Sequence, residues 1–207
     1  MRVLALAQQA CERDWSASIV GDLDEVGIEI ARRLAPGVMV RTVSGDDLAL
    51  ALEEQAAEAD VVHLDTYWHV PDLEGIGALV SNMQDGAYGV RHADLAIDAN
   101  LGSESRFAEP DFSRVRIAGL DGAVIREQVL RRRDELHLPE GRPRVLVVLG
   151  GTDPENLTER ILVSLGQIRM PLDVTVIDTR EKPAIAMAAL SSPHDVNVVG
   201  FVDDLPA

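Results

Sequence analysis

The segment that most restricts how this chain can fold begins at Arg144. Residues 145–149 read Val-Leu-Val-Val-Leu, and Gly150-Gly151-Thr152-Asp153-Pro154 follows at once. Unbroken apolar runs of this length are typical of strands that are buried on both faces of a parallel sheet. Asp153 suits the N-cap of a helix and Pro154 suits its first turn. The segment therefore predicts a strand, a glycine loop and a helix in direct succession.

The glycine pair in this loop has two interpretations. Helix punctuation explains Asp153 and Pro154, but it does not explain Gly150 and Gly151. Paired glycines let the backbone approach a ligand whose negative charge faces a helix N-terminus. The alternative is a tight turn that binds nothing. The loop contains neither Gly-Lys-Ser/Thr nor a full Gly-x-Gly-x-x-Gly, so it matches neither of the common nucleotide-binding glycine motifs.

The rest of the chain alternates between helical and extended patterns. Asp24 is the expected cap of the second helix, and Ser44–Asp47 resembles a capping box at the start of the third. We expect helices over residues 1–13, 24–34, 44–59, 123–137, 154–165 and 184–190. We expect strands over residues 16–20, 38–43, 61–65, 78–81, 95–98, 115–118, 144–149, 174–177 and 196–199. This order predicts an α/β fold with parallel sheets.

Residues 138–143 form the best domain boundary, because this stretch is mostly polar and contains two prolines and a glycine. We therefore expect an N-terminal domain over residues 1–137, a linker over 138–143 and a C-terminal domain over 144–207.

The charge of the chain is strongly acidic, with a formal net charge of −16 and Lys182 as its only lysine. Such a surface repels nucleic acid, so we expect no nucleic-acid partner. A phosphate ligand would need backbone N–H groups or a local arginine. The simpler interpretation of the acidity is that it maintains solubility.

Cys11 is the only cysteine, so no internal disulfide can form, which favours a reducing, cytoplasmic location. Its place in an apolar helical pattern predicts a small buried side chain. We expect no membrane span, since no apolar stretch approaches roughly 20 residues. No signal peptide is expected at the N-terminus, and no motif indicates a metal or a cofactor.

Polar residues gather where two strands are expected to end. His63, Asp65 and Tyr67 lie in or after the strand over residues 61–65, at the edge where open α/β sheets bind ligands. We interpret His63 as a packed histidine, and for Asp65 and Tyr67 functional and structural roles stay open. A second polar series is interpreted mostly as loop and turn residues. It consists of Asp85, Arg91, His92, Asp94, Asp98 and Asn100.

Five segments resemble, in order, the UDP-sugar hydrolases of pseudaminic acid biosynthesis and related spore-coat polysaccharide proteins. That group is related to the peptidoglycan N-acetylglucosaminyltransferases. The first segment, residues 1–8, looks like the helix that follows the family's Gly-x-Gly-His loop. The others are similar to its Val-Asp-x-Tyr, Asp-Leu-x-x-Asp-x-Asn-Leu-Gly and Gly-Gly-Ser-Asp-Pro-x-Asn-Leu-Thr motifs and to a late strand and loop. They are residues 64–67, 93–102, 150–158 and 200–205.

The resemblance implies the GT-B architecture, in which two Rossmann-like domains bind a nucleotide sugar such as a UDP-sugar between them. It implies that Tyr67 lines the sugar site with a catalytic role and that Asp65 and Asn100 bind substrate. It places four further residues on the phosphate side, namely Gly150, Gly151, Thr152 and Asn156.

The chain also departs from this family. The family's first strand and its Gly-x-Gly-His loop would precede Met1, and its nucleotide-gripping segment would follow Ala207. We therefore expect the first sheet to have a gap at its centre, where the first strand of the common doubly wound order lies, and the second to end at an open edge. The alternative is a small α/β domain of unusual strand order.

These departures leave three functions to compare. The main prediction is an incomplete UDP-sugar hydrolase-like protein of bacterial surface-polysaccharide or nonulosonic acid synthesis, not active by itself. The first alternative is a GT-B glycosyltransferase. The second is a non-catalytic interaction protein, in which a partner chain or missing segments complete the sheets.

Overall fold

The structure is a computed structural model that describes residues 2–67, 70–71, 73, 75–106, 113–132, 140–149, 153 and 155–202. The chain forms two compact units, Met1–Leu130 and Arg131–Ala207, and each is described by itself. Both units are α/β with parallel strands, which confirms the predicted fold class. The linker predicted over residues 138–143 lies partly outside the described residues and stays a prediction.

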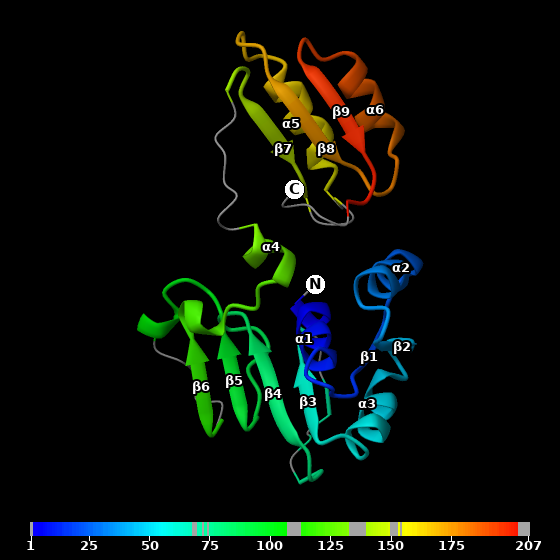
Figure 1. The fold of residues 1–207 in the computed structure, drawn as a ribbon, viewed down its shortest axis with the longest axis vertical. Helices are drawn as coiled ribbons and strands as arrows, with labels where there is room; N and C mark the ends of the chain where they lie inside the picture. The colour runs from blue at the N-terminus through cyan, green and yellow to red at the C-terminus, as the bar shows by residue number, and fades with distance from the viewer. Residues whose placement is uncertain are drawn as a thin grey trace. The chain divides into compact units, whose positions relative to one another are not determined.

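Unit 1 alternates helices and strands in its first half and is mostly strands and turns in its second (Figure 1). Its elements are α1 (Arg2–Cys11), β1 (Ser18–Gly21), α2 (Glu25–Leu34), β2 (Met39–Thr42), α3 (Leu48–Ala56), β3 (Val61–Leu64), β4 (Leu79–Gln84), β5 (Leu95–Asp98), η1 (Ser103–Ser105), β6 (Val115–Ala118), η2 (Gly119–Gly122) and α4 (Glu127–Arg131). The bounds of β5 and β6 are those predicted. β4 is three residues longer than predicted at its carboxyl end. The added residues include two buried polar side chains, Asn82 and Gln84, which the apolar pattern did not indicate as strand.

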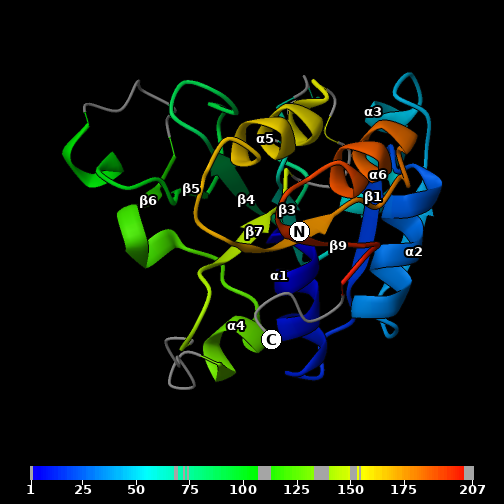
Figure 2. The ribbon, with the colours of Figure 1, turned by 90° about the horizontal axis from the view of Figure 1, so that it is seen from above.

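The strands of unit 1 belong to two parallel sheets. β1 pairs with β2, and a four-stranded sheet has the order β3-β4-β5-β6. Among the described residues no strand pairs β1 with β3, and this division lies where the sequence predicted a central gap. Figure 2, seen from above, shows β6, β5, β4 and β3 in order, with β1 beyond them.

The apolar stripe predicted on the first helix is only partly buried. Leu4, Ala5 and Ala7 of α1 are buried, and the helix packs against β1. Cys11 at its C-terminal end is half-buried, so the prediction of a buried cysteine was wrong.

Of the two helix caps predicted in unit 1, the one on α2 is confirmed and the one on α3 is wrong. Asp24 caps α2 as predicted, because its carboxylate accepts a hydrogen bond from the N–H of Gly27 at 2.8 Å. The capping box at Ser44 was wrong: Ser44 Oγ donates to Asp47 Oδ2 at 2.7 Å, and no side chain caps α3. Because the Ser44 hydroxyl donates to the Asp47 carboxylate, the two side chains bond to each other, and neither caps the first N–H groups of α3.

The helix predicted over residues 123–137 was wrong at its start. Ala123 is extended after the short helix η2, residues 124–126 belong to no helix or strand, and α4 begins only at Glu127. The glycines at 119 and 122 close a 3₁₀ turn before any α-helix can begin. Residues 133–137 lie outside the described residues.

Unit 2 contains β7 (Arg144–Val147), α5 (Leu157–Leu165), β8 (Asp173–Ile177), α6 (Pro183–Leu190) and β9 (Asp195–Val199). The three parallel strands follow the chain, in the order β7-β8-β9. Aliphatic side chains from strands and helices form one core. The buried members are Val147, Leu162, Leu172, Val174, Val176 and Ile185.

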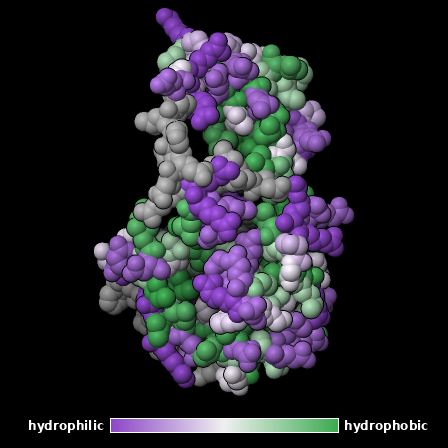
Figure 3. Space-filling view, in the orientation of Figure 1, coloured by the Kyte–Doolittle hydropathy of each residue, from purple (hydrophilic) through white to green (hydrophobic). Residues whose placement is uncertain are grey.

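The surface shows where apolar side chains stay exposed. On the face seen in Figure 3, hydrophobic side chains gather over β5 and β6, and Val115 of β6 is 56% exposed. None of the helices in the described ranges is long and apolar enough to cross a membrane.

Candidate functional site

The candidate site of unit 1 lies at the carboxyl ends of β3, β4 and β5. Tyr67 follows β3, Asp85 follows β4 directly, and Asn100 follows β5 by two residues. Because these strands are parallel neighbours, their carboxyl ends meet at one edge of the sheet, the usual ligand-binding edge of open α/β sheets. The structure therefore brings together Tyr67 and Asn100, two of the residues that the sequence singled out.

Asp85 links the two predicted residues. Tyr67 Oη donates a hydrogen bond to Asp85 Oδ2 at 2.7 Å, and Asn100 Nδ2 donates one to Asp85 Oδ1 at 2.8 Å. The bond from Tyr67, with that from Asn100, lowers the pKa of the Asp85 carboxyl. The same carboxylate raises the pKa of the Tyr67 hydroxyl. Tyr67 thus stays protonated and Asp85 ionised at neutral pH, which suits Tyr67 as a hydrogen-bond donor.

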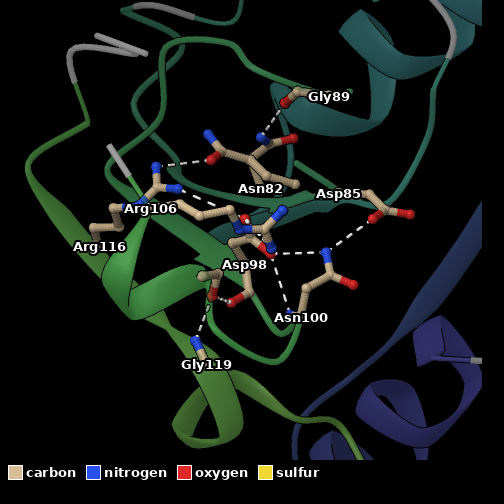
Figure 4. Close-up of polar contacts among 10 residues, drawn as sticks. Asn82, Asp85, Gly89, Asp98, Asn100, Arg106, Arg116 and Gly119 are labelled. Atoms are coloured by element: carbon tan, nitrogen blue, oxygen red, sulfur yellow. Dashed lines mark hydrogen bonds and ion pairs between the residues drawn. The ribbon is translucent and has the colours of Figure 1, made fainter. Parts of the chain in front are cut away.

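The buried carboxylate of Asp98 holds Asn100 in place (Figure 4). Asp98, 2% exposed at the end of β5, accepts hydrogen bonds from the backbone N–H and the side-chain amide of Asn100 at 3.2 and 2.9 Å. Arg116 and Arg106 approach its other oxygen at 3.8 and 4.0 Å. Asp98 ends β5, the strand predicted over residues 95–98, and two arginines offset the cost of burying its charge.

Further polar side chains of the sheet extend this network. Gln84 of β4, 1% exposed, accepts a hydrogen bond from Arg116 at 2.9 Å. Ser103 Oγ donates to the carbonyl of Asp98 at 2.7 Å and accepts from the N–H of Gly119 at 2.6 Å. Sequence reasoning missed Gln84 and Arg116. For Arg116 the signal is a charged residue between two apolar ones in a predicted strand, and no such signal marks Gln84, which lies beyond the strand predicted over residues 78–81.

Asn82 of β4 is fully buried at the same edge. Its amide donates to the carbonyl of Gly89 at 2.6 Å, and its Oδ1 has no hydrogen-bond partner among the described residues. Gly89 has a φ of +70°, and a Cβ there would lie 2.9 Å from the carbonyl oxygen of Met83. Only glycine fits this position, so the loop after β4 is held close to the strand.

Tyr88 is the second aromatic side chain of the site, and sequence reasoning missed it. The turn over Asp85–Tyr88, with Gly86 at a φ of +62°, brings its ring to Tyr67. The two ring centroids lie 5.8 Å apart in an edge-to-face arrangement, and both rings are more than 60% exposed. Exposed tyrosine rings offer flat apolar faces on which a ligand can pack.

Two hollows border these tyrosines. One of about 790 Å³ is lined by Asp85, Tyr88, Asn100 and Arg106 among others. The other, of about 570 Å³, is lined by Tyr67, Tyr88, Leu64 and Val80 among others. Both volumes are in the range of small-molecule sites. The array of Tyr67, Asp85 and Asn100 therefore faces space in which a ligand of sugar size could lie.

Asp65 is bonded to Arg2 and not to the array of Tyr67, Asp85 and Asn100. Its two oxygens accept hydrogen bonds from Arg2 Nε and Nη2 at 3.0 and 2.7 Å. This paired contact raises the pKa of the Arg2 guanidinium. Asp65 thus ties the start of α1 to the end of β3, and its predicted substrate role stays a prediction. Arg2 was missed, since nothing in the sequence links residues 63 positions apart.

His63 is a packed histidine, as predicted. Its Nδ1 lies 3.0 Å from Ser81 Oγ on β4, and its buried Nε2 has no hydrogen-bond partner among the described residues. Burial lowers the pKa of the imidazole below its ordinary 6.5, with Arg2 adding to the effect and Asp65 opposing it. The folded protein therefore keeps this ring neutral at a pH where the unfolded chain begins to protonate it.

This difference predicts a pH effect on stability. A depressed pKa in the fold contributes stability above about pH 6.5, and that stability is lost as the pH falls through the lowered value. We expect the His63→Gln variant to lose this part of the pH dependence. Its unfolding free energy relative to the parent would change by up to about 1.4 kcal/mol between about pH 8 and pH 5.5, measured by denaturant titration. Equal pH profiles of parent and variant would contradict it.

Unit 2 has its own polar cluster at the carboxyl ends of β7 and β8. Lys182, the only lysine, donates to the carbonyl of Asp153 at 2.6 Å and to Asn156 Oδ1 at 3.0 Å. The cluster thus places Asn156, a predicted phosphate-side residue, beside the only lysine side chain of the chain. Gly150, Gly151 and Thr152 lie outside the described residues.

Asp153 caps α5, although not as its N-cap residue. Asn156, with a φ of +51°, occupies that position without a side-chain hydrogen bond to the helix. Asp153 accepts hydrogen bonds from the N–H groups of Leu157 and Thr158 at 2.9 and 3.2 Å. Its partial burial opposes ionisation, but these bonds and Lys182 lower the pKa of Asp153 overall. The loop turns back at Asn156, which lets the carboxylate reach the helix from three residues earlier.

No group of three or more metal-ligand side chains occurs within the described ranges.

Two members of the second polar series, Asp94 and Arg91, form hydrogen bonds to the backbone of other segments. Asp94 Oδ2 accepts a hydrogen bond from the N–H of Val80 at 2.9 Å, and Arg91 donates to the carbonyl of Thr66 at 2.9 Å.

No protein-family model and no curated protein matches this chain. It is similar to the crystal structure of MurG from Acinetobacter baumannii, with 17% sequence identity and a TM-score of 0.56 over 99% of this chain. A glycosyltransferase from Rickettsia africae ESF-5 is similar at 10% identity and a TM-score of 0.49. The chain spans 65% of the length of either protein. The likeness to MurG shows a GT-B-like fold.

Proposed function

We propose that this chain takes part in glycosyl transfer from a nucleotide sugar, with a UDP-sugar as the donor, in bacterial surface-polysaccharide synthesis in the cytoplasm. An acceptor hydroxyl oxygen would bond to the anomeric carbon while the bond from that carbon to the phosphate oxygen breaks. UDP would leave with the electron pair, and the hydroxyl proton would pass to the medium. The GT-B-like fold and the sequence resemblance support this function.

The observation that carries the proposal is the array of Tyr67, Asp85 and Asn100 beside two hollows. It presents a hydroxyl, an ionised carboxylate and an amide around exposed aromatic rings. Sugars are recognised by such groups, because their hydroxyls need both donors and acceptors while their C–H faces pack on aromatic rings. In this proposal Tyr67 contacts the substrate, and Asn100 orients the substrate.

The diphosphate would bind in unit 2. The resemblance places Gly150, Gly151, Thr152 and Asn156 there, and Lys182 stands against Asn156. Backbone N–H groups of a glycine loop and one ammonium group are donors suited to a phosphate, and they are needed because the net charge of the chain is −16. Asp153 already occupies the first N–H groups of α5, so the loop is the better place for the phosphates.

Binding of UDP-sugars tests this function. We expect calorimetry with a panel that includes UDP-N-acetylglucosamine to detect binding, and Tyr67→Ala to weaken it about tenfold through the lost ring contact. Trp15→Ala is the matched control, since Trp15 is an equally exposed aromatic residue of unit 1 outside the array. Absence of binding by every UDP-sugar, or an equal loss in the control, would refute the proposal.

Hydrolysis is the competing reaction. UDP release should be followed with and without acceptor sugars. Release that rises with acceptor, together with a glycosylated product, supports transfer. Release in water that no acceptor increases supports the hydrolase function that the sequence resemblance implies.

A further inference from the structure

The turn over Asp85–Tyr88 separates the two hollows of unit 1. Ala87 and Tyr88 line both hollows, so this turn is the wall that the hollows share. The smaller hollow, of about 570 Å³, extends from this wall to Leu64, and the larger, of about 790 Å³, extends to Asn100. A ligand that occupies both hollows would therefore lie across the turn.

Hydrogen bonds hold this wall in place. The N–H of Asp85 donates to the carbonyl of Tyr88 at 3.0 Å, and the N–H of Tyr88 donates to the carbonyl of Asp85 at 3.1 Å. Directly after the turn, the carbonyl of Gly89 accepts a hydrogen bond from the buried side-chain amide of Asn82 at 2.6 Å (Figure 4). The backbone that carries Tyr88 is therefore fixed before a ligand binds, which lowers the entropic cost of binding.

The two tyrosine rings are oriented so that one sugar ring cannot pack on both of them. Tyr67 borders the smaller hollow, and Tyr88 borders both. The ring centroids lie 5.8 Å apart, and the ring planes make an angle of 72°. The C–H face of a sugar packs parallel to an aromatic plane, so one sugar can lie parallel to only one of two planes that are almost perpendicular. Two aromatic faces at this angle therefore suit two sugar rings, one in each hollow.

Each hollow also has polar groups that suit sugar hydroxyls. Asp85 and Arg106 line the larger hollow, and Tyr67 and Arg91 line the smaller. A carboxylate only accepts hydrogen bonds and a guanidinium only donates them, while the Tyr67 oxygen can accept as it donates to Asp85. Each hollow thus offers a donor, an acceptor and an aromatic face. A ligand made of like units would find the same three kinds of contact on both sides of the wall.

We propose that the acceptor of the transfer is a saccharide of at least two sugar units, with one unit in each hollow and the ring of Tyr88 between them. This inference rests on the proposed glycosyl-transfer function and adds to it the class of the acceptor. Tyr88 is the residue that sets the preference for acceptor length, because its ring contacts both units. A single sugar fills one hollow and leaves the other to water.

Matched pairs of sugars test the proposal on the full chain. Calorimetry compares N-acetylglucosamine with its β-1,4-linked dimer, and glucose with cellobiose and maltose. In at least one pair we expect the disaccharide to bind about tenfold more tightly, because its second unit adds a second aromatic contact. In NMR titrations that disaccharide should shift the amide signals of Leu64 and Leu101, one beside each hollow, with a single dissociation constant. Equal affinities in every pair, no binding by any disaccharide, or shifts beside one hollow alone would overturn the proposal.

Variants of the wall locate the contact. Tyr88→Ala should weaken disaccharide binding about tenfold, and Tyr88→Phe, which keeps the ring, should retain the parent affinity. Trp15→Ala, at an exposed aromatic residue outside the array, is the matched control and should leave disaccharide binding unchanged. If Tyr88→Ala does not fold, Ala87→Leu replaces it, since added bulk on the shared wall should weaken the disaccharide more than the monosaccharide. An unchanged disaccharide affinity in the wall variant, or an equal loss in the control, would contradict the proposal.

UDP separates this inference from the function on which it rests. We expect disaccharide binding to persist in the presence of saturating UDP, because the diphosphate is assigned to unit 2. Displacement of the disaccharide by UDP would mean that the hollows hold the nucleotide, and would refute the acceptor assignment. A chain that binds disaccharides and no UDP-sugar would contradict the transfer function and leave the saccharide site standing. Transfer to monosaccharides as fast as to disaccharides would leave the transfer function standing and refute the two-unit site.

Discussion

The Asp98→Ala variant is expected to lower the unfolding free energy of unit 1 by about 3 kcal/mol. The substitution leaves Arg116 without its carboxylate and Asn100 without the acceptor for two hydrogen bonds, in a position that is 2% exposed. The cost comes from these stranded polar groups more than from the lost attraction. Denaturant titration followed by hydrogen exchange of the β5 amides measures it.

Asp121→Ala is the control for this prediction. Asp121 lies in η2 of the same unit and is exposed, so its loss should change the unfolding free energy by less than about 0.5 kcal/mol. A loss of less than about 1 kcal/mol for Asp98→Ala would mean that the buried network does not hold the site. The Asp98→Ala substitution should also weaken UDP-sugar binding, because Asn100 loses the carboxylate that orients its amide.

The Leu162→Ala variant should destabilise unit 2 by about 3 kcal/mol. Leu162 of α5 is 1% exposed and packs in the core with Val174, Val176 and Ile185. Removing its branched end deletes apolar contacts and leaves a cavity that the sheet cannot fill by a small shift. Hydrogen exchange of the β8 amides in increasing denaturant measures the effect.

Leu190→Ala provides the comparison in the same unit. Leu190 ends α6 and is 82% exposed, so the same chemical change should alter stability by less than about 0.5 kcal/mol. Similar losses in the two variants would contradict the assignment of the core to the residues around Leu162.

Part of the candidate site was predictable because it follows from strand ends. Tyr67 and Asn100 both follow apolar runs, and parallel strands place their carboxyl ends together. Asp85 was also noticed, but as a loop residue. Its role as the link between Tyr67 and Asn100 depends on β3, β4 and β5 being neighbours in that order, which no local pattern specifies.

The amino-acid sequence by itself determined the succession of strands and helices and the parallel α/β class. Apolar periodicity, glycines and capping residues act over a few positions, which explains why β5 and β6 have the predicted bounds. Only the tertiary structure decided which polar groups meet: Arg2 with Asp65, Arg116 with Gln84 and Lys182 with Asn156. Such pairs form between residues distant in the chain, so strand order and burial choose the partner.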